Sequence, residues 1–192
     1  MTLIVGLYTP DRRLFVGADS GSFTDEGNVF VVAGGKLFRK GRFVVGCAGS
    51  PRFAEVFQFG FEPPEPPPTD PAACDAFMVR DFVTSLRDVL AKAGCLSKET
   101  SFEGDMIQAY SGSVVGVQGV GVYYLGADFS IRRPEPANGE QLTATGSGAS
   151  FALGAMVATR STMEPRPRIE ASLKVTAELH NCVRPPYSII EA

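Results

Sequence analysis

The sequence has little of what a metal or cofactor site is built from. It contains one histidine, His180, and four cysteines, none of which stands in a CxxC pair: Cys47, Cys74, Cys95 and Cys182. A Cys/His metal centre therefore has few ligands to draw on, and we expect neither a metal nor another cofactor. The cysteines are expected to be reduced thiols, since no secretory signal is recognised. A nucleophile pair of Cys47 with His180 stays open, although Cys47 lies in an apolar run, where cysteine usually packs without reacting.

Long runs of one residue kind are missing as well. Lys and Arg number 18 against 21 Asp and Glu, and the net charge is −3. Without a basic run, nucleic acid is not an expected partner. The first residues carry no positive cluster and no long apolar segment, so we expect neither a signal peptide nor a membrane anchor, no membrane partner, and a cytoplasmic location. The ATP-binding pattern GxxxxGK[ST] is absent from the chain.

The apolar residues suffice for one core. The chain has 192 residues, of which 44% are hydrophobic, and this predicts a single domain over 1–192. Alternating and apolar runs predict strands at 3–7, 14–18, 36–38, 43–45, 106–110, 114–118, 120–125 and 187–190, and helices at 51–60, 74–93, 150–159 and 169–181. The first two strands are close enough to form a hairpin, and residues 1–48 resemble a mostly antiparallel sheet. The order of strands and helices predicts two packed sheets with helices outside.

One segment interrupts this pattern. Residues 61–71 read FEPPEPPPTDP, with six prolines and three acids. Proline at this density excludes a helix interior or a central strand. We expect a stiff, exposed, acidic connector; a PxxP ligand is the alternative, but a spacer is the commoner use. Met163 to Pro167 is interpreted as a second break before the last helix.

The first six residues, MTLIVG, combine a strand with a reactive end. If Met1 is removed, Thr2 carries a hydroxyl beside a free α-amine. That amine ordinarily titrates near pH 7 to 8, low enough for it to act as a base toward the hydroxyl. Taken alone, the stretch favours an ordinary N-terminal strand in which Thr2 is present for its shape. With Met1 in place there is no α-amine, and the chemistry fails.

Several stretches together carry a family resemblance. They are TLIVG, LFVGADS, KLF, VVGCAGS, TGSGASFALGA and the closing helix and strand through SIIEA. In this order and at these spacings, the chain resembles the proteasome β-subunit family of N-terminal-nucleophile hydrolases, particularly the HslV-like branch and its small bacterial homologues. The resemblance covers nearly the whole chain. It implies a four-layer αββα sandwich, an α+β fold with two mostly antiparallel sheets between helix pairs.

The resemblance also implies roles for single residues. Thr2 matches the N-terminal nucleophile, Asp19 the acid that orients the catalytic lysine, and Lys36 that lysine. A cationic amine near the Thr2 hydroxyl favours its alkoxide-like state. Without the resemblance, Asp19 is a polar strand end and Lys36 an exposed strand lysine. The spacing from Thr2 to Asp19 is one residue longer than usual, which an extra residue in the turn at 8–13 explains.

Three further positions follow from the same resemblance. Gly46 matches the glycine whose N–H faces the oxyanion, where a donor is worth about 2.7–4 kcal/mol. Ser147 matches the serine beside the Thr α-amine, and its ordinary role is a helix N-cap. Glu178 stands where the family commonly has an Asp that supports the amine. It is followed by Leu179-His180-Asn181, where small or hydroxyl residues are usual.

The predicted function is a threonine-type peptidase subunit of a self-compartmentalising assembly. Its implied partners are identical subunits in a ring or stacked rings, a peptide or unfolded-protein substrate, and, where the assembly is driven by ATP, a separate unfoldase. Two alternatives remain open. One is a catalytically silent scaffold subunit of the same fold, and the other is an N-terminal-nucleophile amidase acting on small amides.

Overall fold

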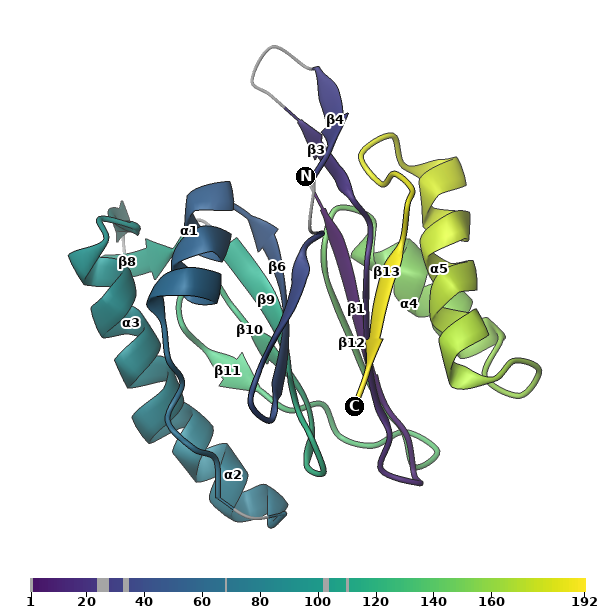
Figure 1. The fold of residues 1–192 in the computed structure, drawn as a ribbon, viewed down its shortest axis with the longest axis horizontal. Coiled ribbons are helices and arrows are strands. Elements are labelled where there is room, and N and C mark those ends of the chain that lie inside the picture. The colour runs from purple at the N-terminus through teal and green to yellow at the C-terminus, as the bar shows by residue number, and fades with distance from the viewer. Residues whose placement is uncertain (1, 24–27, 33–34, 68, 102–103, 110) are drawn as a thin grey trace.

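Two antiparallel sheets lie face to face at the centre of the molecule (Figure 1). The computed structural model describes residues 2–23, 28–32, 35–67, 69–101, 104–109 and 111–192. The first sheet has the order β12-β1-β2-β13, formed by β12 (Gln141–Gly146), β1 (Leu3–Tyr8), β2 (Leu14–Ala18) and β13 (Ser188–Glu191). The second has the order β11-β10-β9-β6-β5, formed by β11 (Ile131–Arg132), β10 (Gly121–Leu125), β9 (Ser111–Val117), β6 (Phe43–Gly49) and β5 (Leu37–Lys40).

The predicted hairpin at the N-terminus is confirmed, with Ile4 opposite Ala18 and Tyr8 opposite Leu14. The expectation of one sheet over residues 1–48 is wrong. β1 and β2 belong to the first sheet, whereas β5 and β6 belong to the second. Both pairs are made of local hairpins, and local pairing does not reveal that the chain changes sheets between them.

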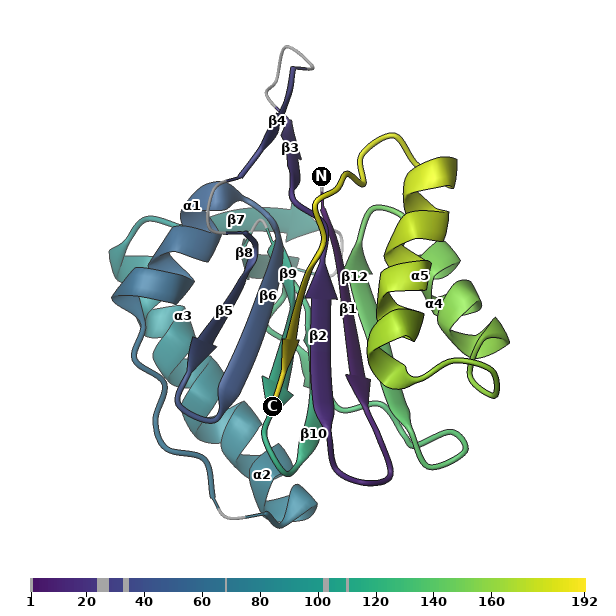
Figure 2. The same ribbon diagram turned by 45° about the vertical axis from the view of Figure 1, so that its right-hand side comes forward.

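Helices cover the outer face of each sheet (Figure 2). The second sheet is covered by α1 (Pro51–Glu55), which continues as the π-helical turn η1 (Val56–Gly60), and by one long helix made of α2 (Pro71–Phe77), η2 (Met78–Phe82) and α3 (Val83–Lys92). The first sheet is covered by α4 (Ala149–Ala158) and α5 (Pro165–Leu179). The fold is therefore the four-layer αββα sandwich that the resemblance implies.

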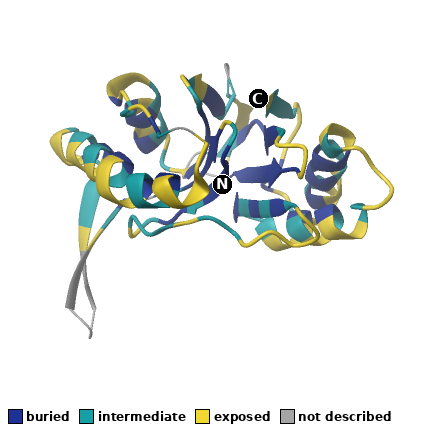
Figure 3. Cartoon of the chain, turned by 90° about the horizontal axis from the view of Figure 1, so that it is seen from below, coloured by how far each residue is buried: buried dark blue, intermediate teal, exposed yellow. Residues whose placement is uncertain are grey.

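Each boundary between layers has its own apolar cluster. Between the second sheet and its helices, Phe57, Phe82 and Leu86 pack with other buried aromatic residues. The two sheets meet through small and β-branched side chains, and the first sheet meets α4 and α5 through Leu173 and its neighbours. Figure 3 shows the consequence: the central strands are buried, and exposed residues gather on the outer sides of the helices and in the loops. The two central strands of the first sheet, β1 and β2, are near-continuously apolar because both of their faces are covered.

The sheets approach most closely where glycine replaces a side chain. A Cβ added at Gly6 would lie 2.5 Å from Cγ2 of Val122 and 2.6 Å from Cγ1 of Val114. Because no neighbour has room for that atom, glycine at this position sets the spacing between β1 and the second sheet.

Two short hairpins extend the sandwich. β3 (Gly21–Phe23) pairs with β4 (Val29–Val31) and projects beyond the body beside the N-terminus (Figure 1). β7 (Leu96–Ser101) pairs with β8 (Gly104–Ala109). The sequence did not predict β3 or β7, because β3 has only three residues and β7, LSKETS, is mostly polar without a clear alternation of apolar and polar residues.

The last helix begins earlier than predicted. The expected break is confirmed at Met163 and Glu164, which lie between α4 and α5, but its end at Pro167 is wrong, because α5 starts at Pro165. Pro165 and Pro167 both fall within the first turn, where backbone N–H groups have no acceptor inside the helix. Proline is compatible with these positions, so its presence alone does not exclude the start of a helix.

The proline-rich connector is less exposed than expected. Phe61 and Pro66 are buried, and the carbonyls of Pro66 and Pro67 both accept hydrogen bonds from Nη1 of Arg42. Lys40 donates to the Phe61 carbonyl. The connector is therefore held against the turn between β5 and β6 rather than standing free. Within the part of the chain that the structure describes, no helix is long and apolar enough to cross a lipid bilayer.

Candidate active site

The register of β1 decides which residues meet at its first residue. Leu3 pairs with Gly146 of β12, and Ile4 pairs with Ala18 of β2. Thr2, Asp19 and Ser147 therefore lie just beyond these paired ends, at one end of the sandwich. Lys36 reaches the same place from the second sheet. The structure thus brings together four of the predicted residues, which are far apart in the sequence.

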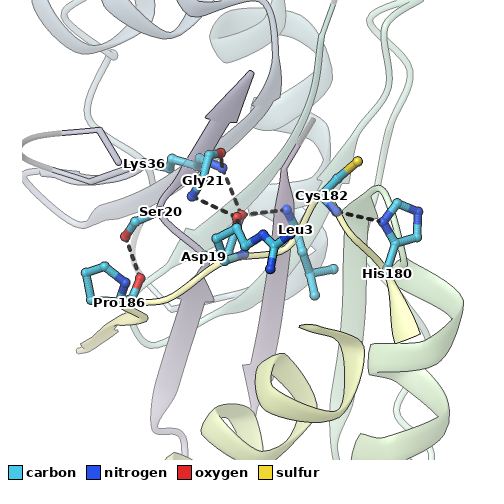
Figure 4. Close-up of polar contacts among 9 residues, drawn as sticks. Leu3, Asp19, Ser20, Gly21, Lys36, His180, Cys182 and Pro186 are labelled. Carbon is cyan, nitrogen blue, oxygen red and sulfur yellow. Dashed lines mark hydrogen bonds and ion pairs between the residues drawn. The ribbon is translucent and has the colours of Figure 1, made fainter. Parts of the chain in front are cut away.

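Asp19 is the fully buried centre of this cluster. Its Oδ1 accepts the N–H of Leu3 at 2.9 Å and a proton of Lys36 Nζ at 2.8 Å. Its Oδ2 accepts the N–H groups of Gly21 at 3.0 Å and Arg184 at 3.2 Å. All four partners are donors, as an ionised carboxylate requires when it is buried. Figure 4 shows how these groups converge from different elements on one carboxylate.

Lys36 is held in one position by this carboxylate. Its side chain is 9% exposed, and besides Asp19 it donates to the backbone carbonyl of Gly21. Burial lowers the pKa of Lys36, and the hydrogen bond and charge of Asp19 oppose that shift without cancelling it. The result is an ammonium group that stays paired yet gives up its proton more readily than a surface lysine. The ordinary role of an exposed strand lysine does not fit this position.

Thr2 is fixed through the backbone on both sides. Its carbonyl accepts the N–H of Ser147 at 2.8 Å, and the next N–H along the chain, that of Leu3, donates to Asp19. The residue as a whole is 7% exposed. Met1, whose removal the chemistry requires, lies outside the described residues. The backbone of Thr2 is therefore positioned by the same groups that hold Lys36.

Gly146 permits the close contact between Thr2 and the Ser147 turn. Its φ is +97°, and a Cβ added there would lie 1.9 Å from the Thr2 carbonyl oxygen. No side chain is compatible with this approach. Ser147 is not the N-cap of α4, since Gly148 takes that place with φ of +81°. Its backbone N–H is directed at Thr2 instead.

The segment 180–186, here called the strap, leads from α5 to β13 and passes over Asp19. The N–H of Arg184 donates to Asp19, and the Arg184 carbonyl accepts the N–H of Ser20 at 3.0 Å. The Ser20 hydroxyl donates to the carbonyl of Pro186 (Figure 4). The strap is thus bound to both Asp19 and Ser20. Sequence reasoning missed it, because its contribution is made by backbone groups.

Gly46 and Gly49 differ in how β6 presents them. Gly46 lies inside the ladder, opposite both Leu37 and Val114, and a Cβ there would meet Cγ2 of Ile4 at 2.5 Å. Because the N–H of Cys47 donates to Lys36, and N–H groups alternate in direction along a strand, the N–H of Gly46 is directed toward β9. Gly49 lies two residues after Cys47, so its N–H points to the same side of β6 as that of Cys47. It is the last residue of β6, is exposed and has a φ of +123°.

Glu178 is the predicted residue that stands apart. It is exposed near the end of α5, and among the described residues no hydrogen bond or ion pair connects it with Thr2, Asp19 or Lys36. Its charge acts on Tyr187, whose pKa is raised mainly by burial and to a smaller extent by Asp19 and Glu178. At the place where the resemblance implies the Glu178 carboxylate, the structure has the strap instead.

The Cys47 and His180 pair has no nucleophilic character. Burial raises the pKa of Cys47 to about 12, and its sulfur accepts from the Ser113 hydroxyl at 3.5 Å. A thiol with so high a pKa supplies almost no thiolate at neutral pH. The described residues contain no group of three or more His, Cys, Asp or Glu side chains that could hold a metal ion.

The layer order and the residues gathered at the start of β1 define the fold of proteasome-like N-terminal-nucleophile hydrolases. Known structures agree. Thiobacillus denitrificans BPH, a bacterial proteasome homologue, in complex with epoxomicin has a TM-score of 0.78 at 20% identity, over 100% of this chain and 98% of that chain. HslV from Trypanosoma brucei has a TM-score of 0.64 at 16% identity, over 99% and 98%.

A third similar structure is the helical assembly of the Anbu complex from Pseudomonas aeruginosa. Its TM-score is 0.65 at 15% identity, over 100% of this chain and 81% of that chain. No protein-family model matches the sequence, and no curated protein matches it either. At these identities the structures establish the fold, and the activity has to be argued from the residues themselves.

Proposed function

We propose that this chain is a threonine-type peptidase subunit in which Thr2, freed by removal of Met1, is the nucleophile. The buried ion pair of Lys36 with Asp19 beside the Thr2 backbone carries the proposal. A buried lysine–aspartate pair is costly to keep for stability alone. Its burial and its position next to an N-terminal hydroxyl residue fit a catalytic role.

The reaction follows from these groups. The Thr2 hydroxyl attacks a peptide carbonyl, and its proton passes through the α-amine to the departing amine. A C–O ester bond to Thr2 forms while the C–N bond breaks, and water then hydrolyses the ester. The positive charge of Lys36, held by Asp19, favours the alkoxide-like state of Thr2. Ser147 holds the Thr2 carbonyl through its N–H, and the resemblance implies that its side chain lies beside the amine.

The oxyanion needs a backbone donor that faces the substrate. The resemblance implies Gly46, but its N–H is directed into the ladder toward β9. Gly49 is better placed, because its N–H points away from β9, on the side of β6 that faces β5. It also lies beyond the last residue of β6 that pairs with β5. Ala48 connects it to the site, since its Cβ lies 3.3 Å from the Cβ position of Gly146. We therefore assign the oxyanion donor to Gly49. Glu178 has no assigned step.

Intact mass of the tag-free chain tests the proposal directly. We expect the mass to lack one methionine, and we expect epoxomicin to add one molecule to Thr2. The physical reason is that only a free N-terminal threonine combines a hydroxyl with its own basic amine. Thr2→Val, which keeps the shape of the side chain, is the control and should take no adduct.

A chain that retains Met1 and takes no adduct would favour the silent scaffold instead. The intact Lys36–Asp19 pair is the observation that makes us prefer the peptidase. The proposed substrate is a peptide or unfolded protein. An amidase acting on small amides would be favoured by a monomer or dimer with an open site.

The proposed partners are further copies of this chain in a ring or stacked rings. α4 contains no charged residue, and it exposes Phe151, Gly154 and Val157 along one side. On the neighbouring α5, Leu179 is 61% exposed. A helix apolar on all sides is usually buried, so this helix layer fits a contact between copies. Because the chain has no P-loop motif, an assembly driven by ATP would need a separate unfoldase to hydrolyse the ATP.

Phe151→Glu is expected to break this assembly. Phe151 is 46% exposed on an uncharged helix, and a carboxylate buried there without a partner costs several kcal/mol. We expect sedimentation velocity to shift from a large species toward the monomer. Val79→Glu is the matched control, because Val79 is 57% exposed on η2, in the opposite helix layer, beside the charged residues Arg80 and Asp81. Equal sedimentation of both variants and the parent would contradict an interface through α4.

A further inference from the structure

His180 occupies a place between two parts of the site that the mechanism uses. It caps the C-terminus of α5, with its N–H donating to the carbonyl of Thr176 at 2.8 Å. From there the chain enters the strap that reaches Asp19. The resemblance assigns no role to this residue, and the nucleophile pair considered for it is excluded by the buried Cys47.

The imidazole of His180 binds the first turn of the strap. Its Nδ1 accepts the N–H of Cys182 at 3.3 Å, and its carbonyl accepts the N–H of Val183 at 3.1 Å. Two residues later, the N–H of Arg184 donates to Oδ2 of Asp19. Nδ1 of His180 therefore holds the first turn of the strap, and the next donor along the strap, the N–H of Arg184, holds the Asp19 carboxylate (Figure 4). An imidazole accepts at Nδ1 only when it is neutral and carries its proton on Nε2.

The same ring lies near the turn that holds Thr2. A Cβ added at Gly148 would lie 3.7 Å from Cδ2 of His180 and 3.6 Å from its Cβ. Gly148 directly follows Ser147, whose N–H donates to the Thr2 carbonyl. His180 thus lies close to the turn that holds Thr2 and accepts a hydrogen bond from the strap that holds Asp19 and, through it, Lys36.

We propose that His180 is a positioning residue, whose Nδ1 acceptor fixes the strap so that Arg184 keeps Asp19 and Lys36 in register with Thr2. The inference rests on the proposed peptidase for its kinetic consequence. The geometric part concerns the strap alone and holds whatever the chain catalyses.

Two variants separate the acceptor from the ring. His180→Asn keeps an oxygen acceptor for the Cys182 N–H, as asparagine does in local turns, but loses the ring. His180→Phe keeps a ring against Gly148 but has no acceptor. We expect His180→Asn to retain kcat within about threefold, and His180→Phe to lower kcat by about 10-fold or more with little change in KM, because small displacements of catalytic groups are costly. The opposite order would mean that the ring only packs, and would overturn the proposal.

Hydrogen exchange of the strap tests the geometry without any turnover. Peptides covering residues 181–187 should exchange about 3- to 10-fold faster in His180→Phe than in the parent chain, and at nearly the parent rate in His180→Asn. Equal exchange in all three proteins would overturn the role of the acceptor. If the parent chain is inactive and takes no epoxomicin adduct, the proposed function fails while the exchange result still decides the role of His180.

Discussion

Lys36→Ala is expected to lower kcat for a peptide substrate by about 10²- to 10⁴-fold, the range associated with losing a group that transfers or stabilises a proton. Lys36 is the one charged side chain hydrogen-bonded to Asp19 among the described residues, and that carboxylate also holds the backbone N–H that follows Thr2. Removing the ammonium takes away the positive charge that favours the ionised Thr2 hydroxyl. We expect KM to change little, because only 9% of the Lys36 side chain is exposed and little of it can contact a bound substrate. Turnover of a fluorogenic peptide by the processed chain is the measurement.

The variant also leaves a buried carboxylate without its cation. Breaking a buried pair typically costs 3–5 kcal/mol, but Asp19 keeps three backbone donors, so we expect the fold to survive with a lower Tm. Lys40→Ala is the matched control. Lys40 lies at the hairpin end of β5, opposite the end that Lys36 precedes, and pairs at 2.8 Å with Glu62, which is exposed. Its loss should leave kcat unchanged. Undiminished turnover in Lys36→Ala would remove this lysine from the mechanism.

The family resemblance singled out Asp19 and Lys36. The hydrophobic pattern alone shows Asp19 just after the strand 14–18 and Lys36 at the start of the strand 36–38, which by itself gives neither residue a role. What the pattern lacks is the register. The pairing of Leu3 with Gly146, and of Ile4 with Ala18, brings Asp19 to the same end of the sandwich as Thr2, and Lys36 reaches that end from the second sheet, next to β5. Long-range pairing depends on the packing of both sheet faces, which no local stretch encodes.

Gly46 and Gly49 illustrate the same limit within one strand. Both glycines lie in the short motif VVGCAGS, and the sequence offers no reason to prefer the second. The direction of each N–H depends on which residues of β5 face β6, and a shift by one residue reverses it. Glu178 is a similar case, because helical periodicity places it on α5 but does not give the rotation of that helix about its axis. The strap was not predicted, because its donors are backbone groups, and backbone groups leave no signal in the sequence.

Gly146→Ala is expected to remove activity by a different route, through the position of the nucleophile. The added Cβ would lie 1.9 Å from the Thr2 carbonyl oxygen, far inside van der Waals contact, and the φ of +97° is itself strained for a residue with a side chain. Either β12 or the start of β1 has to shift. The first bond lost is the one from the Ser147 N–H to the Thr2 carbonyl. Since a misplacement of about 1 Å costs on the order of 10²-fold in rate, we expect at least that loss in kcat.

A substitution at a second glycine, Gly94, distinguishes the effect of backbone strain from that of steric displacement. Gly94 also has a positive φ, +68°, but a Cβ there meets nothing within 4 Å, and it lies just after α3, away from Thr2. Gly94→Ala therefore carries only the conformational cost, about 1–2 kcal/mol, and should lower Tm without changing kcat. In Gly146→Ala the loss of kcat should persist at temperatures where the variant is fully folded, and epoxomicin should label Thr2 more slowly. A folded Gly146→Ala variant with parental kcat would show that the contact between Thr2 and the Ser147 turn does not position the nucleophile, and the assignment of Ser147 to the site would fall with it.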